Sequence, residues 1–342
     1  MKTLHIHGRA GTSTLMVGER LSRLGRYIPE GRTVILTDPV VRKLYGDRFP
    51  DCPVIEIGLG EGNKTLQTVQ EIYGRLIEME ADRSTFLVGI GGGIVCDVAG
   101  FAASTYLRGV RFGFVATTLL AQVDASVGGK NGVNFAGYKN MVGTFNQPDF
   151  VICDTDLLKT LTGPDLLCGF AEIVKHGAIA DPALFQFIED RWRDALALDP
   201  PTIERMVVDS VVVKSGIVNE DETEAGVRRK LNFGHTFGHA VEKVAGVPHG
   251  EAVSVGMAAA SLLSVKQGWL GREEGDRILR LLARIGLPTR LAVNPGSAMA
   301  ALRRDKKREG DRIRLVLLKR IGEAAIEEIR ISDLEESLRE LV

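Results

Sequence analysis

The sequence predicts an α/β N-terminal domain with a mostly parallel sheet, followed by an all-α, helical C-terminal domain. In the first half, short runs of β-branched and apolar residues alternate with helical patterns. Because the strand patterns are apolar almost throughout, we expect a parallel sheet that is covered on both faces. Beyond about Asp154 long helical patterns follow, and strand signals nearly vanish. We therefore expect two domains, residues 1–155 and 156–342.

The strands expected in the first half are short apolar runs, and the helices between them show helical spacing of apolar residues. The expected strands are Thr33–Thr37, Val54–Ile57, Phe86–Ile90 and Phe112–Ala116, and the expected helices are Leu66–Met79 and Val95–Tyr106.

The second half is expected to be built from helices, with one late hairpin around Gly322. The expected helices are Leu166–Ile179, Pro182–Leu198, Thr202–Asn219, Lys230–Val244, Glu251–Gln267 and Glu273–Ile285, and the expected hairpin strands are Ile313–Leu318 and Glu323–Ile329.

Composition excludes several classes of protein. The net charge of −1 argues against a nucleic-acid or anionic-membrane partner, because no excess of positive charge is present. The four cysteines are scattered without a C-x-x-C pair, which argues against a disulfide framework. The apolar run Ala252–Val265 is too short to span a bilayer. The N-terminus has no apolar signal-peptide core, so we expect a cytoplasmic protein.

The most informative segment, Leu231–His249, contains three of the six histidines. His235 and His239 are four residues apart, which places them on one face of a helix, and His249 returns after a short Gly/Pro turn. Neutral imidazole is a common zinc ligand, and three protein ligands with an open position are typical of a catalytic metal site. Histidine pairs at this spacing also occur by chance, so the spacing alone leaves both interpretations open.

A glycine-rich turn, Gly89–Asp97, follows a predicted buried strand and begins a helix. Glycines there let the backbone approach a pyrophosphate, and the helix N-terminus supplies N–H donors. The spacing is not the ordinary G-x-G-x-x-G, and a plain tight connection is the alternative. Asp38 follows a strand and could bind ribose hydroxyls or simply form a turn. The loop Glu61–Lys64 is polar and could equally begin a helix.

Cations in apolar or glycine-rich surroundings form the third feature. Lys130, Lys175 and Lys214 have such neighbours, whereas Lys306 lies in a charged run that is typical of a solvated surface. A buried lysine needs an anion, and a phosphate or carboxylate substrate would provide one.

These motifs together resemble the 3-dehydroquinate synthase family. The resemblance extends from about Glu61 to Lys306 and rests on G-G-G-x-x-x-D, T-T-L-L-A-Q-V-D-A-S-V-G-G-K, K-N-M-V-G-x-F, A-E-I-V-K and L-N-F-G-H-T-F-G-H-A with H-G-E-A-V. It implies an NAD-binding α/β domain and a helical metal-binding domain. The implied reaction converts 3-deoxy-D-arabino-heptulosonate 7-phosphate, a keto-acid sugar phosphate of the shikimate pathway, into 3-dehydroquinate and phosphate. The implied steps are transient oxidation by NAD, phosphate elimination, reduction, ring opening and intramolecular aldol closure.

The resemblance also implies roles for individual residues. It implies one divalent ion, zinc with cobalt as the alternative, bound by Glu172, His235 and His249, and it places His239 against the substrate and His176 outside the ligand set. Catalytic roles are implied for Lys130, Lys175, Glu224 and His239. The implied substrate-binding residues are Arg108, Asp124, Lys130, Asn140, Lys175, Lys214, Arg228, Asn232, His239 and Lys306. The implied NAD contacts are Asp38, Glu61, Lys64, Gly92, Gly93, Ile94, Asp97, Thr117, Thr118, Lys139, Leu157, Leu158, Lys159 and Thr160.

Arg108 matches an arginine that reaches the phosphate in a neighbouring subunit, which implies a homodimer. Three features depart from the family pattern: Cys96 replaces a common glycine, Cys168 replaces a small polar residue, and Phe135–Tyr138 replaces the usual loop. The remaining alternatives are another sugar-phosphate cyclase, a metal-dependent polyol dehydrogenase and a non-catalytic sugar-phosphate-binding module. A polyol dehydrogenase would carry Asp in place of Glu172 and would not need the cationic set.

Overall fold

The computed structural model describes residues 1–8, 11–291, 294–302, 308–309, 311–331 and 334. The chain forms two compact units. The first contains Met1–Leu161 and Lys214–Thr223, and the second contains Thr162–Val213 and Glu224–Val342. The short stretch Lys214–Thr223 belongs to the first unit although the helical pattern around it is continuous, which the sequence patterns did not suggest.

The first unit contains a seven-stranded sheet in the order β1-β2-β9-β6-β5-β3-β4. All neighbours are parallel except β1 and β2. The mostly parallel sheet that the sequence predicts is therefore confirmed. The strands are β1 (Lys2–Gly8), β2 (Gly11–Val17), β3 (Thr33–Thr37), β4 (Val54–Glu56), β5 (Phe86–Gly91), β6 (Phe112–Ala116) and β9 (Phe150–Cys153).

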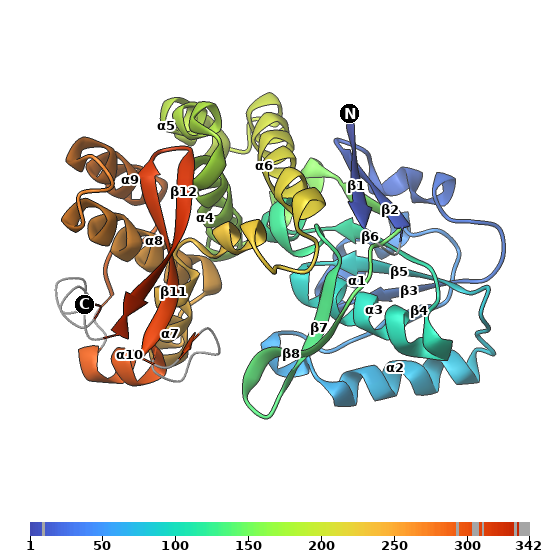
Figure 1. Cartoon of the computed structure of the whole chain (residues 1–342). Helices are drawn as coiled ribbons and strands as arrows, with labels where there is room; N and C mark the ends of the chain where they lie inside the picture. Colours follow the sequence, from blue (N-terminus) through green and yellow to red (C-terminus); the bar gives the residue numbers. More distant parts are fainter. Residues whose placement is uncertain (9–10, 292–293, 303–307, 310, 332–333, 335–342) are drawn as a thin grey trace. The chain divides into compact units, whose positions relative to one another are not determined.

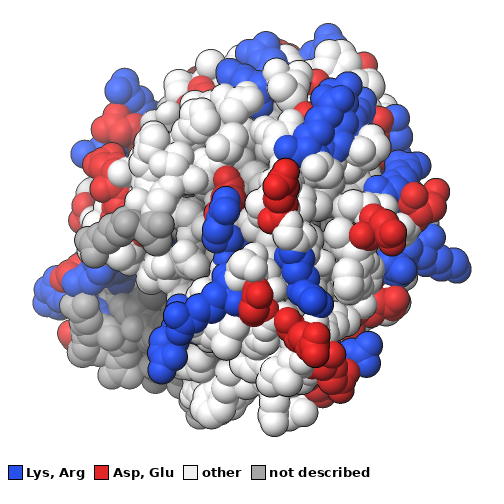
Figure 2. Space-filling view, turned by 90° about the vertical axis from the view of Figure 1, so that its right-hand side faces the viewer, with Lys and Arg blue, Asp and Glu red and all other residues white. Residues whose placement is uncertain are grey.

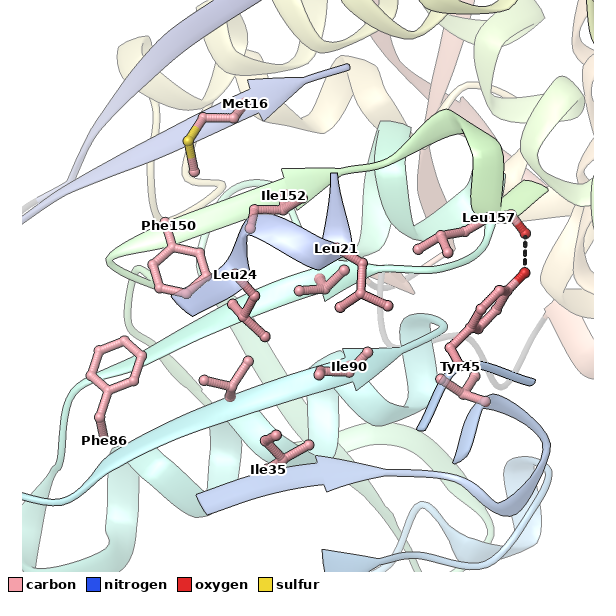
Figure 3. Packing of buried hydrophobic residues seen from close by; sticks show 13 residues of the cluster. Met16, Leu21, Leu24, Ile35, Tyr45, Phe86, Ile90, Phe150, Ile152 and Leu157 are labelled. Carbon is pink, nitrogen blue, oxygen red and sulfur yellow. Dashed lines mark hydrogen bonds between the residues drawn. The ribbon is translucent and has the colours of Figure 1, made fainter. Parts of the chain in front are cut away.

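Both faces of this sheet are covered because side chains alternate along each strand. Phe86, Val88 and Ile90 of β5 join a core cluster with residues such as Leu21 and Tyr45 (Figure 3). The intervening glycines of β5 face the other way, and α3 (Gly93–Thr105) packs along that side (Figure 1). The remaining elements are α1 (Pro39–Tyr45), α2 (Leu66–Glu78), the β7–β8 hairpin (Lys130–Phe135 and Tyr138–Phe145), and the turns η1 (Leu21–Arg26), η2 (Gly46–Arg48), η3 (Glu61–Asn63), η4 (Tyr106–Arg108), η5 (Ala121–Ala125) and η6 (Thr155–Thr160).

The second unit is mainly helical and also contains a three-stranded antiparallel sheet. The predicted hairpin is confirmed: β11 and β12 pair around Gly322, whose φ of +88° favours glycine. The elements are α4 (Gly163–Ala180), α5 (Pro182–Leu196), α6 (Pro200–Glu220, whose end belongs to the first unit), η7 (Val227–Asn232), α7 (His235–Ala245), α8 (His249–Lys266), α9 (Arg272–Ile285), α10 (Pro295–Leu302), β10 (Arg308–Glu309), β11 (Arg312–Arg320) and β12 (Glu323–Arg330).

The predicted helix Lys230–Val244 is wrong in one respect, because it is broken at Gly234. Gly234 has φ +79°, and a Cβ on it would lie 2.8 Å from the carbonyl oxygen of Val253. Only glycine combines that backbone conformation with so close an approach. The break makes His235 the first residue of α7, so its ring stands at a helix N-terminus.

Several elements lacked a clear sequence signal. The edge strand β1 carries His5 and His7 among its exposed residues, and β7 and β8 contain glycine and asparagine, so none forms an apolar run. None of the helices within the described ranges is both long and apolar enough to cross a membrane.

Candidate metal centre and nucleotide-binding turn

Three predicted ligands converge in the second unit. Glu172 is fully buried on α4, and His235 and His249 are the first residues of α7 and α8. Glu172 Oε1 lies 3.6 Å from His235 Nε2 and 3.8 Å from His249 Nε2. Ligand bonds of about 2.0–2.2 Å in a tetrahedral site separate donor atoms by about 3.4 Å. The three side chains therefore have the spacing of ligands to a single ion.

The state of Glu172 provides a test of whether a cation fits. One carboxylate oxygen accepts a hydrogen bond from the buried ammonium of Lys175. The other, Oε1, is buried and has no hydrogen-bond partner among the described residues. An unpartnered buried carboxylate oxygen is costly, and a bound cation removes that cost. The residues present thus fit a divalent ion with nitrogen and oxygen ligands.

The ring of His235 is also oriented to bind an ion. Its Nδ1 lies 3.2 Å from the carbonyl oxygen of Phe233, to which it can donate. That bond places the proton on Nδ1 and leaves the Nε2 lone pair facing Glu172.

His239 does not belong to this group of ligands, although it follows His235 by four residues, the spacing at which two helical side chains can bind one ion. It lies one turn along α7 and is exposed, with ring centroids 5.4 Å from His235 and 6.3 Å from His249. Among the described residues, the donors within 4.8 Å of one another include His235 and His249 with Glu172, but not His239. His176 is buried, and its Nδ1 lies 2.6 Å from Ser210 Oγ.

The other predicted residues of the second unit cluster on η7 and the loop before it. Arg228 is only 2% exposed. Asn232 donates to Glu224 Oε1 at 2.5 Å, and Glu224 has a φ of +62°. Lys306 lies outside the described residues.

In the first unit, the glycine-rich turn joins β5 to α3 as predicted. Gly92 is the N-cap of α3 and provides no side-chain cap to the first N–H groups of the helix. A Cβ on Gly92 would lie 3.0 Å from Thr118 Cγ2, and one on Gly93 would lie 3.0 Å from Ala125 Cβ. The glycines therefore have a packing role here, and they leave helix N–H groups without side-chain caps, as a pyrophosphate site requires.

Polar residues predicted to contact NAD have protein partners in this unit. Lys64 and Asp97 form an ion pair, and burial raises the pKa of Asp97 although the Lys64 charge opposes the shift. Glu61 accepts a hydrogen bond from Asn134 at 2.8 Å. Asp38 caps α1 by accepting from the N–H groups of Val40 and Val41 at 2.9 Å, the local role that remained open from the sequence.

The remaining nucleotide candidates are Thr117, Thr118, Lys139 and η6. Thr117 is buried beside β5, and Lys139 is exposed on β8. Tyr45, which the sequence patterns did not single out, places its hydroxyl 3.2 Å from the Leu157 carbonyl oxygen (Figure 3). The same hydroxyl lies 2.6 Å from Thr160 Oγ1. It thereby fixes the shape of η6.

The cationic candidates of the first unit differ in burial. Lys214 is buried and donates to Asp124 Oδ1 at 2.6 Å, so its anion comes from the chain itself. Lys130, whose glycine-rich surroundings favoured a buried position, is instead exposed at the start of β7. Arg108 and Asn140 are also exposed, with φ values of +71° and +50°. On the face in Figure 2, basic and acidic side chains are interspersed.

The fold is shared by a dehydrogenase and by two synthases of known structure. It matches a probable glycerol dehydrogenase from Sinorhizobium meliloti with a TM-score of 0.67 at 20% identity, over 94% of this chain and 93% of that one, a likeness of fold alone. A 2-deoxy-scyllo-inosose synthase, solved with carbaglucose-6-phosphate, NAD⁺ and Co²⁺, matches over 100% of both chains with a TM-score of 0.88 and 27% identity. A 2-epi-5-epi-valiolone synthase from Streptomyces hygroscopicus subsp. jinggangensis with bound NAD⁺ and Zn²⁺ matches over 96% of both chains, with a TM-score of 0.88 and 28% identity.

Sequence comparison identifies the family among proteins that share this fold. The 3-dehydroquinate synthase N-terminal model matches residues 54–167, and the C-terminal model matches residues 169–308. A 3-dehydroquinate synthase from Halorhodospira halophila is 44% identical over 89% of this chain and 88% of its own length. Another from Methylococcus capsulatus is 40% identical over 95% of both. The chain belongs to the 3-dehydroquinate synthase family.

Proposed function

We propose that this chain is a 3-dehydroquinate synthase, a phosphate-eliminating lyase that depends on NAD and one divalent ion. The proposal rests on one observation. Two histidine side chains lie beside a buried carboxylate oxygen of Glu172 that has no hydrogen-bond partner among the described residues. Relatives named for this activity are 40–44% identical over most of the chain, which supports the same reaction here. The reaction converts 3-deoxy-D-arabino-heptulosonate 7-phosphate to 3-dehydroquinate and phosphate.

Zinc, with cobalt as the alternative, would act as Lewis acid on a substrate hydroxyl, and NAD would accept and return a hydride. Glu172, His235 and His249 would hold the ion, and Lys175 keeps the second oxygen of Glu172 occupied. The N-terminus of α3 would receive the pyrophosphate of NAD.

Substrate recognition is assigned to cationic and amide side chains. The buried guanidinium of Arg228 suits a carboxylate, because its planar donor set can bind two oxygens at once. The exposed imidazole of His239 can donate a hydrogen bond to a substrate oxygen or exchange a proton with it. Glu224, held by Asn232, remains a proposed proton acceptor.

Another sugar-phosphate cyclase is the nearest alternative, because a 2-deoxy-scyllo-inosose synthase solved with carbaglucose-6-phosphate and a 2-epi-5-epi-valiolone synthase share the fold at 27–28% identity. Arg228 favours the keto-acid substrate, since a guanidinium can bind both oxygens of a carboxylate at once. A polyol dehydrogenase is less compatible with the glutamate ligand and with that cation.

Turnover of the purified protein tests the proposal directly. Phosphate release from the seven-carbon substrate should require both NAD and the ion, stop with a chelator and resume when zinc is restored. One phosphate should appear for each product, without lasting NADH absorbance, because oxidation and reduction take place on the same bound substrate. Stoichiometric NADH accumulation from a simple polyol would instead assign the chain to the dehydrogenases.

We also infer a homodimer in which Arg108 reaches the neighbouring site. The β7–β8 hairpin exposes Phe135, Tyr138 and Phe145, each at 47% or more, a surface that a second copy could cover. Asn146, directly after β8, donates to Ser104 at 3.1 Å, so the base of this hairpin lies beside the turn that carries Arg108.

Subunit mixing tests the role of Arg108. Arg108→Ala and His239→Ala should each be nearly inactive alone, and a mixture refolded or exchanged together should regain activity. In a mixed dimer, one site keeps its own His239 and receives Arg108 from the other subunit. A mixture as inactive as its components, although mixed dimers are present by sedimentation, would contradict the shared site.

A further inference from the structure

His249 is the most exposed of the three proposed ligands and begins a helix that lacks an ordinary cap. Its side chain is 30% exposed, compared with 12% for His235 and 0% for Glu172. Pro248 is the N-cap of α8 and provides no side-chain cap. The first N–H groups of a helix have no partner within it, and a Ser, Thr, Asp or Asn at the N-cap normally accepts from one of them. For α8 the acceptor has to come from elsewhere.

The acceptor is the thiol of Cys168. The N–H of Gly250, the second residue of α8, donates to Cys168 Sγ at 3.3 Å. A Cβ on Gly250 would lie 2.3 Å from Cys168 Cα, so the two backbones are in contact at this point. Cys168 lies on α4 one turn before Glu172. The thiol therefore joins α4 and α8 next to the ligand that each helix carries.

Glu242 lies on the other side of the His249 ring. Its Oε1 is 3.7 Å from His249 Nδ1, whereas the Nε2 of the same ring faces Glu172. Glu242 follows His235 by two turns of α7, so it projects from the ligand-bearing face of that helix. A carboxylate that accepts from the outer N–H of a metal-binding histidine fixes the ring orientation. At 3.7 Å Glu242 lies just beyond hydrogen-bond distance, close enough to take that role when the ring binds an ion.

We propose that Cys168 and Glu242 are positioning residues for His249. Cys168 fixes the backbone on which His249 stands, and Glu242 fixes its ring. The inference rests on the proposed function, because it takes His249 as a ligand. Cys168, which departs from the usual residue of the family, is thus given a specific role in this chain.

The proposal is tested by the zinc affinity of the full-length apoprotein, measured by competition with a chromophoric chelator. This measurement does not depend on enzyme activity. Cys168→Ala and Glu242→Gln should each weaken zinc binding about 10–100-fold, as expected for supporting partners of a ligand. Cys168→Ser keeps an acceptor for Gly250 and should bind zinc nearly as the unaltered protein does. Cys52→Ala and Glu78→Gln are the matched controls, since Cys52 packs against the core of the first unit and Glu78 is an exposed residue of α2. Both should leave zinc affinity unchanged.

The melting temperature of each apoprotein separates positioning from a general loss of structure. The proposal expects a smaller zinc-induced rise in both weakened variants. Apo melting should be unaltered in Glu242→Gln and slightly lower in Cys168→Ala, because the N–H of Gly250 loses its acceptor. Unchanged zinc affinity of both Cys168→Ala and Glu242→Gln would overturn it and leave the proposed function intact. If Cys168→Ala does not fold, Glu242→Gln decides alone, and unchanged affinity there overturns the proposal. Failure of the unaltered protein to bind zinc would overturn the proposed function itself.

Discussion

The metal centre of the second unit and the glycine turn of the first are built on opposite principles. Around Glu172 the site consists of buried and partly buried side chains whose charges and lone pairs face one another. Around Gly92 it consists of backbone, because the side chains that could fill the space are missing. The first kind of site fails when a group is removed, and the second fails when one is added.

The largest effect should follow from removing the charge at the metal centre. Glu172→Ala deletes a proposed ligand and strands the buried ammonium of Lys175. Removing one partner of a buried ion pair costs about 3–5 kcal/mol. We therefore expect loss of bound metal together with that loss of unfolding free energy, measured by elemental analysis and denaturant titration. Full metal content in the purified variant would remove Glu172 from the ligand set.

Arg228→Ala should come next. Truncating one partner of a desolvated charge pair typically costs about 2–5 kcal/mol, so kcat/KM should fall roughly 30-fold to several thousand-fold. Metal content should not change. The variant should bind an analogue that keeps the phosphate but lacks the carboxylate nearly as tightly as the unaltered protein does. Equal losses for analogues with and without the carboxylate would show that Arg228 binds the phosphate or supports the fold.

His239→Ala sharpens the distinction between ligand and neighbour. The variant should keep its metal, whereas His249→Ala should lose it, and kcat should fall about 100-fold or more through the missing proton or hydrogen-bond donor. Metal content and kcat measured on the same preparations check this. Loss of the ion from His239→Ala with retention by His249→Ala would reverse the assignment.

Gly92→Ala tests the backbone site by addition. Its methyl group would meet Thr118, and overpacking typically costs about 1–3 kcal/mol. That cost falls on the folded protein. NAD affinity, measured by calorimetry, should fall as well, because the methyl group hinders the close approach of a pyrophosphate to the turn, while zinc affinity stays the same. An unchanged dissociation constant for NAD would show that this turn is only a tight connection.

The smallest effect should come from Gly74→Ala, the matched control. Gly74 is exposed within α2, and a Cβ there would meet nothing within 4 Å. The change should stabilise the protein by about 0.4–1 kcal/mol, because alanine has fewer unfolded conformations to lose. NAD and zinc affinity should both be unaltered, and denaturant titration measures the gain.

Local patterns were sufficient for the parts of the molecule that depend on local forces. The apolar runs at Thr33–Thr37 and Phe86–Ile90 predicted buried strands, and the glycine-rich turn predicted an uncapped helix N-terminus. The hairpin around Gly322 was also visible in the sequence. In each case the spacing of apolar residues or a positive φ is a property of neighbours in the chain.

The metal centre depended on information that local patterns lack. From spacing alone, His235 with His239 or Glu172 with His176 is as good a pair as the set that converges, and only the resemblance to a family selected Glu172, His235 and His249. The tertiary structure brings those three together because Gly234 breaks the helix and because α8 begins at His249. It also pairs Lys214 with Asp124 and sets Cys168 against Gly250. Such contacts join residues far apart in sequence and form only when helices pack. The periodicity of apolar residues therefore does not predict them.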